Sequence, residues 1–523
     1  MMLLLLLLLL LPAVTATAPV APTTIAAHPE GTVSVAWGNV TARSHATATV
    51  HTPNSYAWQR TDPRTGNSNP MHDVLYSRLA ALGTDHIRYM QAQDGNGLCN
   101  LSAYPEPFPP DHAAKRTSWD MAGIDAFVSD FCAATKGGDC SETIVFIGPL
   151  PPWFFHPTPT SPAVCNATDS HSCTGPLIDP TGRQAGEYYS RIVSWFTKGF
   201  LIDEMGTKIA GGHHFKFTYW EVLNEPNLYA HYNLVQPSMV AEYTTIYDGI
   251  TSVMHRDHPT LQYAAMCWAG IPDNGLIQYF MNESNHDAAA PWPPAFVTFH
   301  IYDGPGAMGS PVGLSPAIVA AAQEVVEFVA TSSGGRTRSF VDEMGIFGCA
   351  PINYTTVLDD QPNRFAFHNP RAAWFAAAYG QLASIGVDAM GSSQFFGYDG
   401  ITGQANNWPH GGGATTQGYW YYPCLSALDW TTGKPNARYY AVQMLVAELG
   451  GSQMKAMSPA VVVQPPLPSP PPPPPKPPTP PPPPPGPPCP AVARRHRPPA
   501  PTAPLPSRCC CTSRTRVVLY EFR

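Results

Sequence analysis

Between residues 71 and 450 the chain alternates helical stripes with short β-rich runs, and this alternation constrains its fold more than any other feature. Apolar residues recur at helical spacing in the segments 71–82, 124–131, 238–254, 316–329, 369–385 and 436–449. Apolar, β-rich runs lie between them, at 86–91, 143–148, 215–223, 261–267, 296–301, 338–342 and 387–396. No Asn-Gly or Asp-Gly hairpin signal precedes these runs, so the pattern predicts parallel strands joined by helical crossovers.

One more strand upstream of Met71 would bring the count to eight, and a region of roughly 380 residues suits a (β/α)8 barrel (a TIM barrel) that carries insertions. A doubly wound parallel sheet is the alternative architecture. The catalytic domain is predicted to span residues 66–450. Residues 19–65 precede it and contain two runs that alternate like strands, VSVAW and ATATVHT.

Two carboxylates follow predicted strands directly, where a barrel places its functional residues. Glu225 comes after the run 215–223, and Glu343 comes after the run 338–342. We count these strands as the fourth and the seventh, which lie across the barrel mouth from each other. A pair of carboxylates facing one cleft is the minimum needed to cleave a glycosidic bond. One protonates the leaving oxygen, while the other attacks the anomeric carbon or activates water.

Two other carboxylates lie near Glu225 and Glu343 in the sequence, one as an alternative catalytic residue and one as a buried partner. Asp342 could replace Glu343, but alternation along a strand predicts that it points to the opposite face. Glu221 lies four residues before Glu225, on the same strand face and deeper in the barrel, so it is predicted to be a buried partner. For Glu225 itself, the alternative interpretation is a carboxylate that caps the following helix.

The two strand-end segments resemble a known family. Residues 220–227 (WEVLNEPN) and 340–345 (FVDEMG) are similar to the acid/base and nucleophile strands of retaining glycosidases of clan A, and most of all to glycoside hydrolase family 39, which includes β-xylosidases and α-L-iduronidases. The likeness extends to HIRY at 86–89, PPW at 151–153, FHIY at 299–302 and the segment 425–449. It covers about residues 70–450 in order.

The resemblance implies a role for each matching residue. Glu225 would be the general acid/base and Glu343 the nucleophile. Asn224 would hydrogen-bond the 2-hydroxyl of the sugar, and Tyr302 would contact the nucleophile. Three further residues would shape the substrate subsite, namely His300, Arg88 and Trp153. The resemblance implies no cofactor and no metal, and residues 19–65 could be a remnant of the family's accessory β-sandwich.

The first residues predict secretion. An unbroken leucine run from Leu3 to Leu11, followed by Pro12 and small residues, is typical of a signal peptide within residues 1–18, and it is too short to span a bilayer. Acceptor sites for N-glycans support an extracellular location, and they occur at Asn39, Asn100, Asn166, Asn282 and Asn353. Cys132 with Cys140 and Cys165 with Cys173 could form local disulfides or remain buried thiols.

The C-terminal segment 451–523 is predicted to be a proline-rich tail and not a second domain. From Pro465 to Pro490, 20 of 26 positions are proline, which favours an extended polyproline II rod. Such a rod would act as a spacer or associate with a cell wall or extracellular matrix. The formal net charge is -8, without the clustered basic face that nucleic-acid binding requires.

Together these features predict a secreted retaining O-glycosidase that acts by double displacement on plant- or algal-type polysaccharides or glycoconjugates, with a β-xyloside-like substrate favoured. Two alternatives stay open. One is a hydroxyproline-rich cell-wall glycoprotein whose barrel binds sugar without cleaving it. The other is an endo-glycanase of another clan A family.

The stretch 304–309 matches the dinucleotide-binding pattern G-x-G-x-x-G. The next helix starts too late in the sequence for its N-terminus to bind a dinucleotide there, so a loop over the barrel mouth is predicted instead.

Overall fold

The computed structural model describes part of the chain, namely residues 32–35, 42–52, 58–61, 66–89, 117, 119–147, 150, 154, 156, 177–227, 239–303, 313–346, 369–396, 426–428, 433–449, 455–457 and 460–463. The predicted signal peptide, the proline rod, the pair Cys165 and Cys173 and the loop 304–309 lie outside these residues. One compact unit spans Gly31–Val463.

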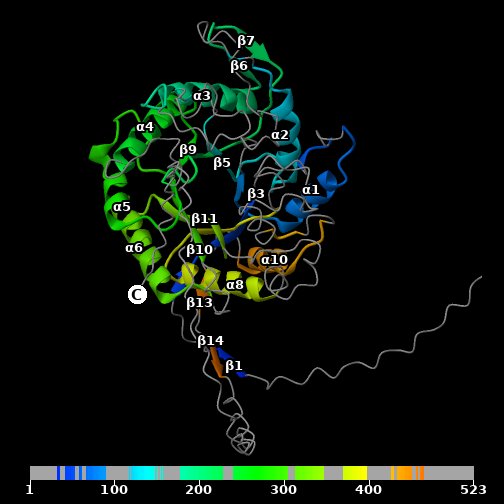
Figure 1. Ribbon diagram of the computed structural model, residues 1–523, viewed down its shortest axis with the longest axis vertical. Coiled ribbons are helices and arrows are strands. Elements are labelled where there is room, and N and C mark those ends of the chain that lie inside the picture. Colours follow the sequence, from blue (N-terminus) through cyan, green and yellow to red (C-terminus); the bar gives the residue numbers. More distant parts are fainter. Residues whose placement is uncertain are drawn as a thin grey trace, which may run out of the picture. The chain divides into compact units, whose positions relative to one another are not determined.

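Eight parallel strands close into a barrel, which confirms the predicted fold and excludes the doubly wound sheet (Figure 1). In chain order they are β3 (Thr47–Thr52), β4 (Ile87–Tyr89), β5 (Thr143–Ile147), β8 (Tyr219–Val222), β9 (Gln262–Trp268), β10 (Phe296–Asp303), β11 (Arg338–Ile346) and β12 (Ala389–Ser392). The strands that carry Glu225 and Glu343 at or near their ends are the fourth and the seventh, as predicted.

Helices surround the barrel in a ring (Figure 1). They are α1 (Met71–Leu82), α2 (Ala122–Ala134), α3 (Arg183–Lys198), α4 (Met239–Asp257), the short α5 (Asn274–Phe280), α6 (Pro316–Ser332), α8 (Asn369–Ser384) and α10 (Ala437–Leu449). Two of the helix ends carry residues that commonly cap helices. Ser315 accepts a hydrogen bond from the Ile318 amide at the start of α6, and Gly83 ends α1 with a φ of 62°.

The N-terminal boundary of the barrel requires a correction. The run ATATVHT contains β3, which is the first barrel strand, so it is part of the barrel and not of a separate segment 19–65. The upstream strands β1 (Thr32–Val35) and β2 (Ala42–Ser44) pair instead with β14 (Ala460–Val463) and β13 (Lys455–Met457). Residues 455–463 therefore contribute two strands, and the extended tail cannot begin at 451.

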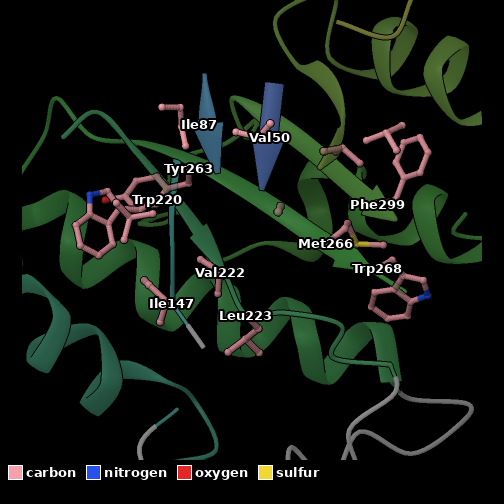
Figure 2. Packing of buried hydrophobic residues seen from close by; sticks show 14 of the residues in the cluster. Val50, Ile87, Ile147, Trp220, Val222, Leu223, Tyr263, Met266, Trp268 and Phe299 are labelled. Carbon is pink, nitrogen blue, oxygen red and sulfur yellow. The ribbon is translucent and has the colours of Figure 1, made fainter. Parts of the chain in front are cut away.

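Apolar side chains form two layers around the barrel wall. The larger layer lies between strands and helices, and includes Trp220, Val222 and Ile147 (Figure 2). The smaller layer takes residues from five barrel strands: Ile144, Ala264, Phe296, Phe340 and Ala389. Tyr219, two residues before the interior side chain of Glu221, packs against this smaller layer, so we place the layer in the barrel interior, below the polar site.

A disulfide joins Cys132 at the end of α2 to Cys140, which confirms one of the two predicted local pairs. Two strands that the sequence reading missed, β6 (Phe200–Ile202) and β7 (Lys208–Ala210), form an antiparallel hairpin after α3. Among the described helices, none has the length and apolar character needed to cross a membrane.

Candidate active site

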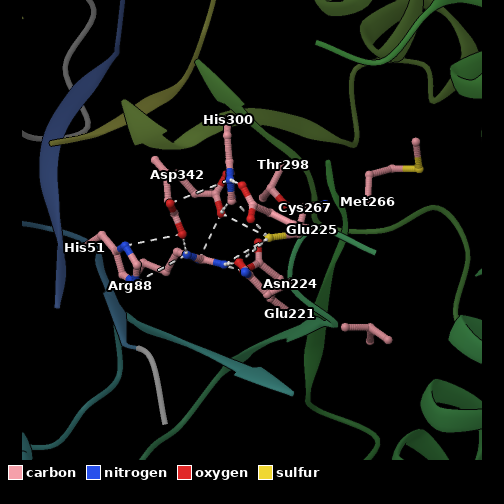
Figure 3. Close-up of polar contacts among 12 residues, drawn as sticks. His51, Arg88, Glu221, Asn224, Glu225, Met266, Cys267, Thr298, His300 and Asp342 are labelled. Atoms are coloured by element: carbon pink, nitrogen blue, oxygen red, sulfur yellow. Dashed lines mark hydrogen bonds and ion pairs between the residues drawn. The ribbon is translucent and has the colours of Figure 1, made fainter. Parts of the chain in front are cut away.

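Six of the seven predicted site residues converge at the carboxyl ends of the barrel strands: Arg88, Asn224, Glu225, His300, Tyr302 and Glu343. Figure 3 shows four of them, namely Arg88, Asn224, Glu225 and His300. They come from β4, β8, β10 and β11 or from the residues that directly follow them. The seventh, Trp153, lies outside the described residues.

The two candidate catalytic glutamates face each other across the imidazole of His300. One carboxylate oxygen of Glu225 lies within 4.8 Å of one carboxylate oxygen of Glu343. His300 Nδ1 lies 2.7 Å from Glu225 Oε1 and 3.6 Å from Glu343 Oε2. Both carboxylates retain some exposure, with 15% of the Glu225 side chain and 10% of the Glu343 side chain accessible. Both can therefore reach a ligand at the barrel mouth.

Arg88 organises the floor of the site from a fully buried position. Its Nη1 donates to Glu343 Oε1 at 2.6 Å, and its Nη2 donates to Asn224 Oδ1 at 2.8 Å. Its Nε lies 2.7 Å from Glu221 Oε2 and 2.8 Å from Asp342 Oδ2. One guanidinium thus contacts three carboxylates, so the predicted interior position of Glu221 is confirmed.

Electrostatics keep Glu343 ionised. Burial alone would raise its pKa, but the positive charges of His300 and Arg88 outweigh burial and hold the pKa of this carboxyl well below its usual range. Tyr302 adds a hydrogen bond, because its hydroxyl donates to Glu343 Oε2 at 2.6 Å. An ionised carboxylate fixed by several donors is suited to act as a nucleophile.

His300 and Tyr302 keep their protons. Burial alone would lower the pKa of His300, but nearby acidic groups, with Glu343 and Asp342 first among them, raise it well above the usual value. Burial, together with the adjacent Glu343 charge, raises the pKa of Tyr302 far above that of a free tyrosine. His300 is therefore a charged donor between the two glutamates, and Tyr302 is a neutral one.

Two site residues appear where strand alternation breaks. In the pairing of β10 with β11, Phe299 pairs with Val341, but the next residue, His300, pairs with Glu343. Asp342 is therefore an extra residue on β11 and forms a β-bulge. Asp342 consequently points into the interior beside Arg88, and the prediction that it faces the other way is wrong. The pairing of β9 with β10 skips Cys267 in the same manner.

Cys267 and His51 were not identified from the sequence. The buried Cys267 sulfur accepts from Arg88 Nη2 at 2.9 Å, and His51 Nδ1 lies 3.4 Å from Glu343 Oε1. Burial lowers the pKa of His51 to about 3, so its ring stays neutral. The sequence signal that could have identified His51 is its position on β3, the first barrel strand. In a closed barrel the first strand lies beside the second and the eighth, which brings its side chains to the site.

The backbone around the acid/base candidate is strained. Leu223 and Glu225 have φ values of 67° and 44°, and Met266 and Cys267 on the neighbouring strand have 78° and 44°. Such conformations are costly for residues other than glycine and cluster at functional sites. The Glu225 amide donates to the Cys267 carbonyl oxygen at 2.9 Å, so the two strained turns support each other.

Two groups of described residues have ligand atoms close enough to hold a metal ion: Glu225 with His300 and Glu343, and Cys267 with His300 and Asp342. The first group consists of the catalytic candidates themselves. The second group lies directly beneath them.

Comparison with known proteins supports the fold. No family model matches the chain, and no curated protein matches its sequence. Among solved structures it is similar to the GH39 enzyme from Xanthomonas axonopodis pv. citri, with a TM-score of 0.50 and 15% identity over 80% of this chain and 70% of that chain.

Two further structures align less well. A monomeric beta-xylosidase from Caulobacter crescentus CB15 has a TM-score of 0.47 and 12% identity, over 80% of this chain and 70% of that one. An alpha-L-arabinofuranosidase from Thermotoga maritima has a TM-score of 0.46 and 14% identity, over 83% and 76%. The fold is therefore a (β/α)8 barrel similar to that of a GH39 enzyme, as the sequence resemblance implied.

Proposed function

We propose that this barrel is a retaining O-glycosidase that hydrolyses its substrate by double displacement. The observation that carries the proposal is the approach of Glu225 and Glu343, since one carboxylate oxygen of Glu225 lies within 4.8 Å of one carboxylate oxygen of Glu343. Retaining enzymes place their two carboxyl groups roughly 5–5.5 Å apart, whereas inverting enzymes leave about 6.5–9.5 Å for a water molecule. The spacing here supports retention.

The two glutamates differ in the way that double displacement requires. Glu343, held ionised by Arg88 and Tyr302, attacks the anomeric carbon and forms a covalent glycosyl-enzyme. Glu225 gives its proton to the departing oxygen, and in the second half of the reaction it takes a proton from the water that attacks the intermediate. Because His300 contacts Glu225 at 2.7 Å, it fixes the orientation of this carboxyl through both steps.

The remaining candidate residues position the sugar. Asn224 is 4% exposed and is held by Arg88, so its amide is oriented before substrate arrives. We propose that it binds the 2-hydroxyl of the sugar at the cleavage point, where hydrogen bonds strengthen in the transition state. Trp153 is proposed to line the same subsite on the basis of the sequence resemblance.

We further propose a β-xyloside-like substrate of plant- or algal-type origin and a secreted enzyme that its proline-rich tail links to a wall or matrix. The substrate proposal rests on the resemblance of residues 70–450 to family 39. Secretion rests on the leucine-rich leader, the N-glycan acceptor sites and the Cys132–Cys140 disulfide.

Hydrolysis of a panel of aryl glycosides tests the proposal, with xyloside, arabinoside, glucoside, galactoside and iduronide as substrates. We expect wild type to cleave at least one and to release the sugar first with the anomer of the substrate, as read by proton NMR. Glu343→Gln should lose turnover. Glu225→Ala should lose it too, but should regain it with added azide on a substrate whose leaving group needs no proton. Glu283→Gln, which removes an exposed carboxylate, is the matched control.

Each other outcome has a distinct meaning. First release of the opposite anomer, or full activity in Glu343→Gln, would contradict the proposed mechanism. Oligosaccharide binding without any turnover would favour the non-catalytic wall glycoprotein. Cleavage of internal bonds in oligosaccharides, with aryl monosaccharides left intact, would favour an endo-glycanase.

A further inference from the structure

Three ligand atoms beneath the two glutamates form a nearly equilateral triangle. Cys267 Sγ lies 3.4 Å from His300 Nε2 and 3.5 Å from Asp342 Oδ2, and His300 Nε2 lies 3.4 Å from Asp342 Oδ2. All three side chains are fully buried. The triangle exists because the bulges at Cys267 and Asp342 turn both side chains inward.

These separations match those of a tetrahedral zinc site. Zinc binds sulfur at about 2.3 Å, and nitrogen and oxygen at about 2.0–2.2 Å, in tetrahedral geometry. The edges of such a tetrahedron are therefore roughly 3.3–3.6 Å long. A Zn²⁺ ion could bind all three atoms with little movement of their side chains.

The surroundings of the triangle also fit a metal. His300 Nδ1 contacts Glu225 Oε1 at 2.7 Å, which leaves Nε2 for the ion in the carboxylate–histidine–metal arrangement common at metal sites. Asp342 Oδ1 is buried and has no hydrogen-bond partner among the described residues. Asn224 Oδ1 lies 3.4 Å from the Cys267 sulfur and could supply a fourth ligand.

Arg88 is the main opposing charge, since it lies 2.9 Å from the sulfur and 2.8 Å from Asp342 Oδ2. Metal binding requires the thiolate and the neutral imidazole, so it releases one proton from Cys267 and one from the charged His300. One Zn²⁺ thus replaces two protons, and the net charge facing Arg88 does not change. The guanidinium can remain as a donor to two metal ligands.

We infer that Cys267, His300 and Asp342 form a binding site for a thiophilic divalent cation such as Zn²⁺. The ion takes the place of the proton on His300 Nε2, while Nδ1 keeps its proton and its contact with Glu225. The inference rests on the triangle of ligand atoms and not on the proposed glycosidase function.

Titration of the full-length protein with Co²⁺ tests binding without any assay of activity. We expect a thiolate-to-cobalt charge-transfer absorption that Zn²⁺ abolishes by competition. The band should disappear in Cys267→Ser and Cys267→Ala, and the Zn²⁺ affinity should fall at least roughly 10-fold, the smallest loss seen even for partners of metal ligands. The difference spectrum isolates this thiol from the other cysteines. His72→Ala, which removes a histidine flanked by Asp73 and Asp130 outside the site, should keep the band.

A band of equal strength in both Cys267 variants, or no Zn²⁺-competed band in wild type, overturns the inference. If neither variant folds, X-ray absorption spectroscopy of the zinc-loaded wild type decides. We expect one sulfur ligand at about 2.3 Å, with nitrogen and oxygen as the other ligands. A zinc ion with several sulfur ligands would contradict the proposed site. Absence of glycoside turnover in the metal-free wild type would refute the proposed function, while the cobalt spectrum still decides the site.

Discussion

Replacing Glu221 with glutamine should change how the stability of the protein depends on pH. Burial, together with the Asp342 charge, raises the pKa of Glu221 from 4.5 to about 7, even though Arg88 Nε lies 2.7 Å away. Between these two values the folded protein holds a proton that the unfolded chain releases. The free energy of unfolding therefore falls as the pH rises.

The magnitude follows from the two pKa values. With 4.5 for the unfolded chain and about 7 for the folded protein, the Glu221 contribution to the free energy of unfolding falls by roughly 2–3 kcal/mol from pH 5 to pH 8. Glutamine has the shape of the protonated acid and keeps an oxygen that can accept from Arg88, but it has no charge to desolvate. Glu221→Gln should therefore gain roughly 2–3 kcal/mol of stability relative to wild type over this pH range.

Urea unfolding followed by tryptophan fluorescence at both pH values measures this difference. The other titrating groups are common to both proteins and cancel in the comparison. The exposed variant Glu283→Gln should show no such change. If the stability difference between Glu221→Gln and wild type is the same at pH 5 and pH 8, the carboxyl does not hold its proton in the folded state, and this account of the Arg88 cluster is refuted.

Three other predictions concern single contacts. Tyr302→Phe removes the 2.6 Å hydrogen bond to Glu343. It should lower kcat/KM roughly 10- to 150-fold and move the acidic limb of the pH–rate profile upward, and an unchanged profile would contradict the assigned contact. Removal of the Cys132–Cys140 disulfide by alanine at both positions should lower the free energy of unfolding by about 2.5 kcal/mol, measured with urea. Burial lowers the pKa of His86 from 6.5 to about 4, so between pH 7 and pH 5 the unfolded chain binds a proton that the folded protein does not. The free energy of unfolding should therefore fall by about 2 kcal/mol as the pH drops from 7 to 5. His86→Phe keeps a ring against Tyr219 and Phe296 and should remove this loss of stability at acidic pH. If the stability of the variant falls as steeply between pH 7 and pH 5 as that of wild type, His86 does not cause the loss.

Local signals in the sequence predicted the barrel well. The β-rich runs in the sequence lie within a few residues of seven of the eight barrel strands. The missed helix α3 carries its apolar residues as adjacent pairs, such as Tyr188 with Tyr189 and Ile192 with Val193, all of them buried. Pairs at this spacing do indicate a helix, but the surrounding polar residues concealed the pattern.

Strand alternation correctly predicted the interior position of Glu221, although β8 ends at Val222 and Glu225 lies in the strained turn that follows it. Asp342 and Cys267 depend on bulges, which arise from the match between neighbouring strands and leave no signal in a single strand. His51 contacts Glu343 across nearly the whole length of the barrel sequence, and no local pattern encodes that contact.

The same two bulges give the site its charge balance. Without its bulge β11 would present either Asp342 or Glu343 to the interior, and Arg88 would then face two carboxylates instead of three. The additional buried charge is costly unless a further cation compensates for it, and the proton on His300 does so, since His300 lies 3.4 Å from Asp342 and 3.6 Å from Glu343. Glu343 is therefore kept ionised by cations that other carboxylates hold in place, and not by exposure to water. The position of Arg88 and the proton on His300 are consequences of strand register, so the chemistry of the two glutamates is set by the geometry of β9, β10 and β11 beneath them.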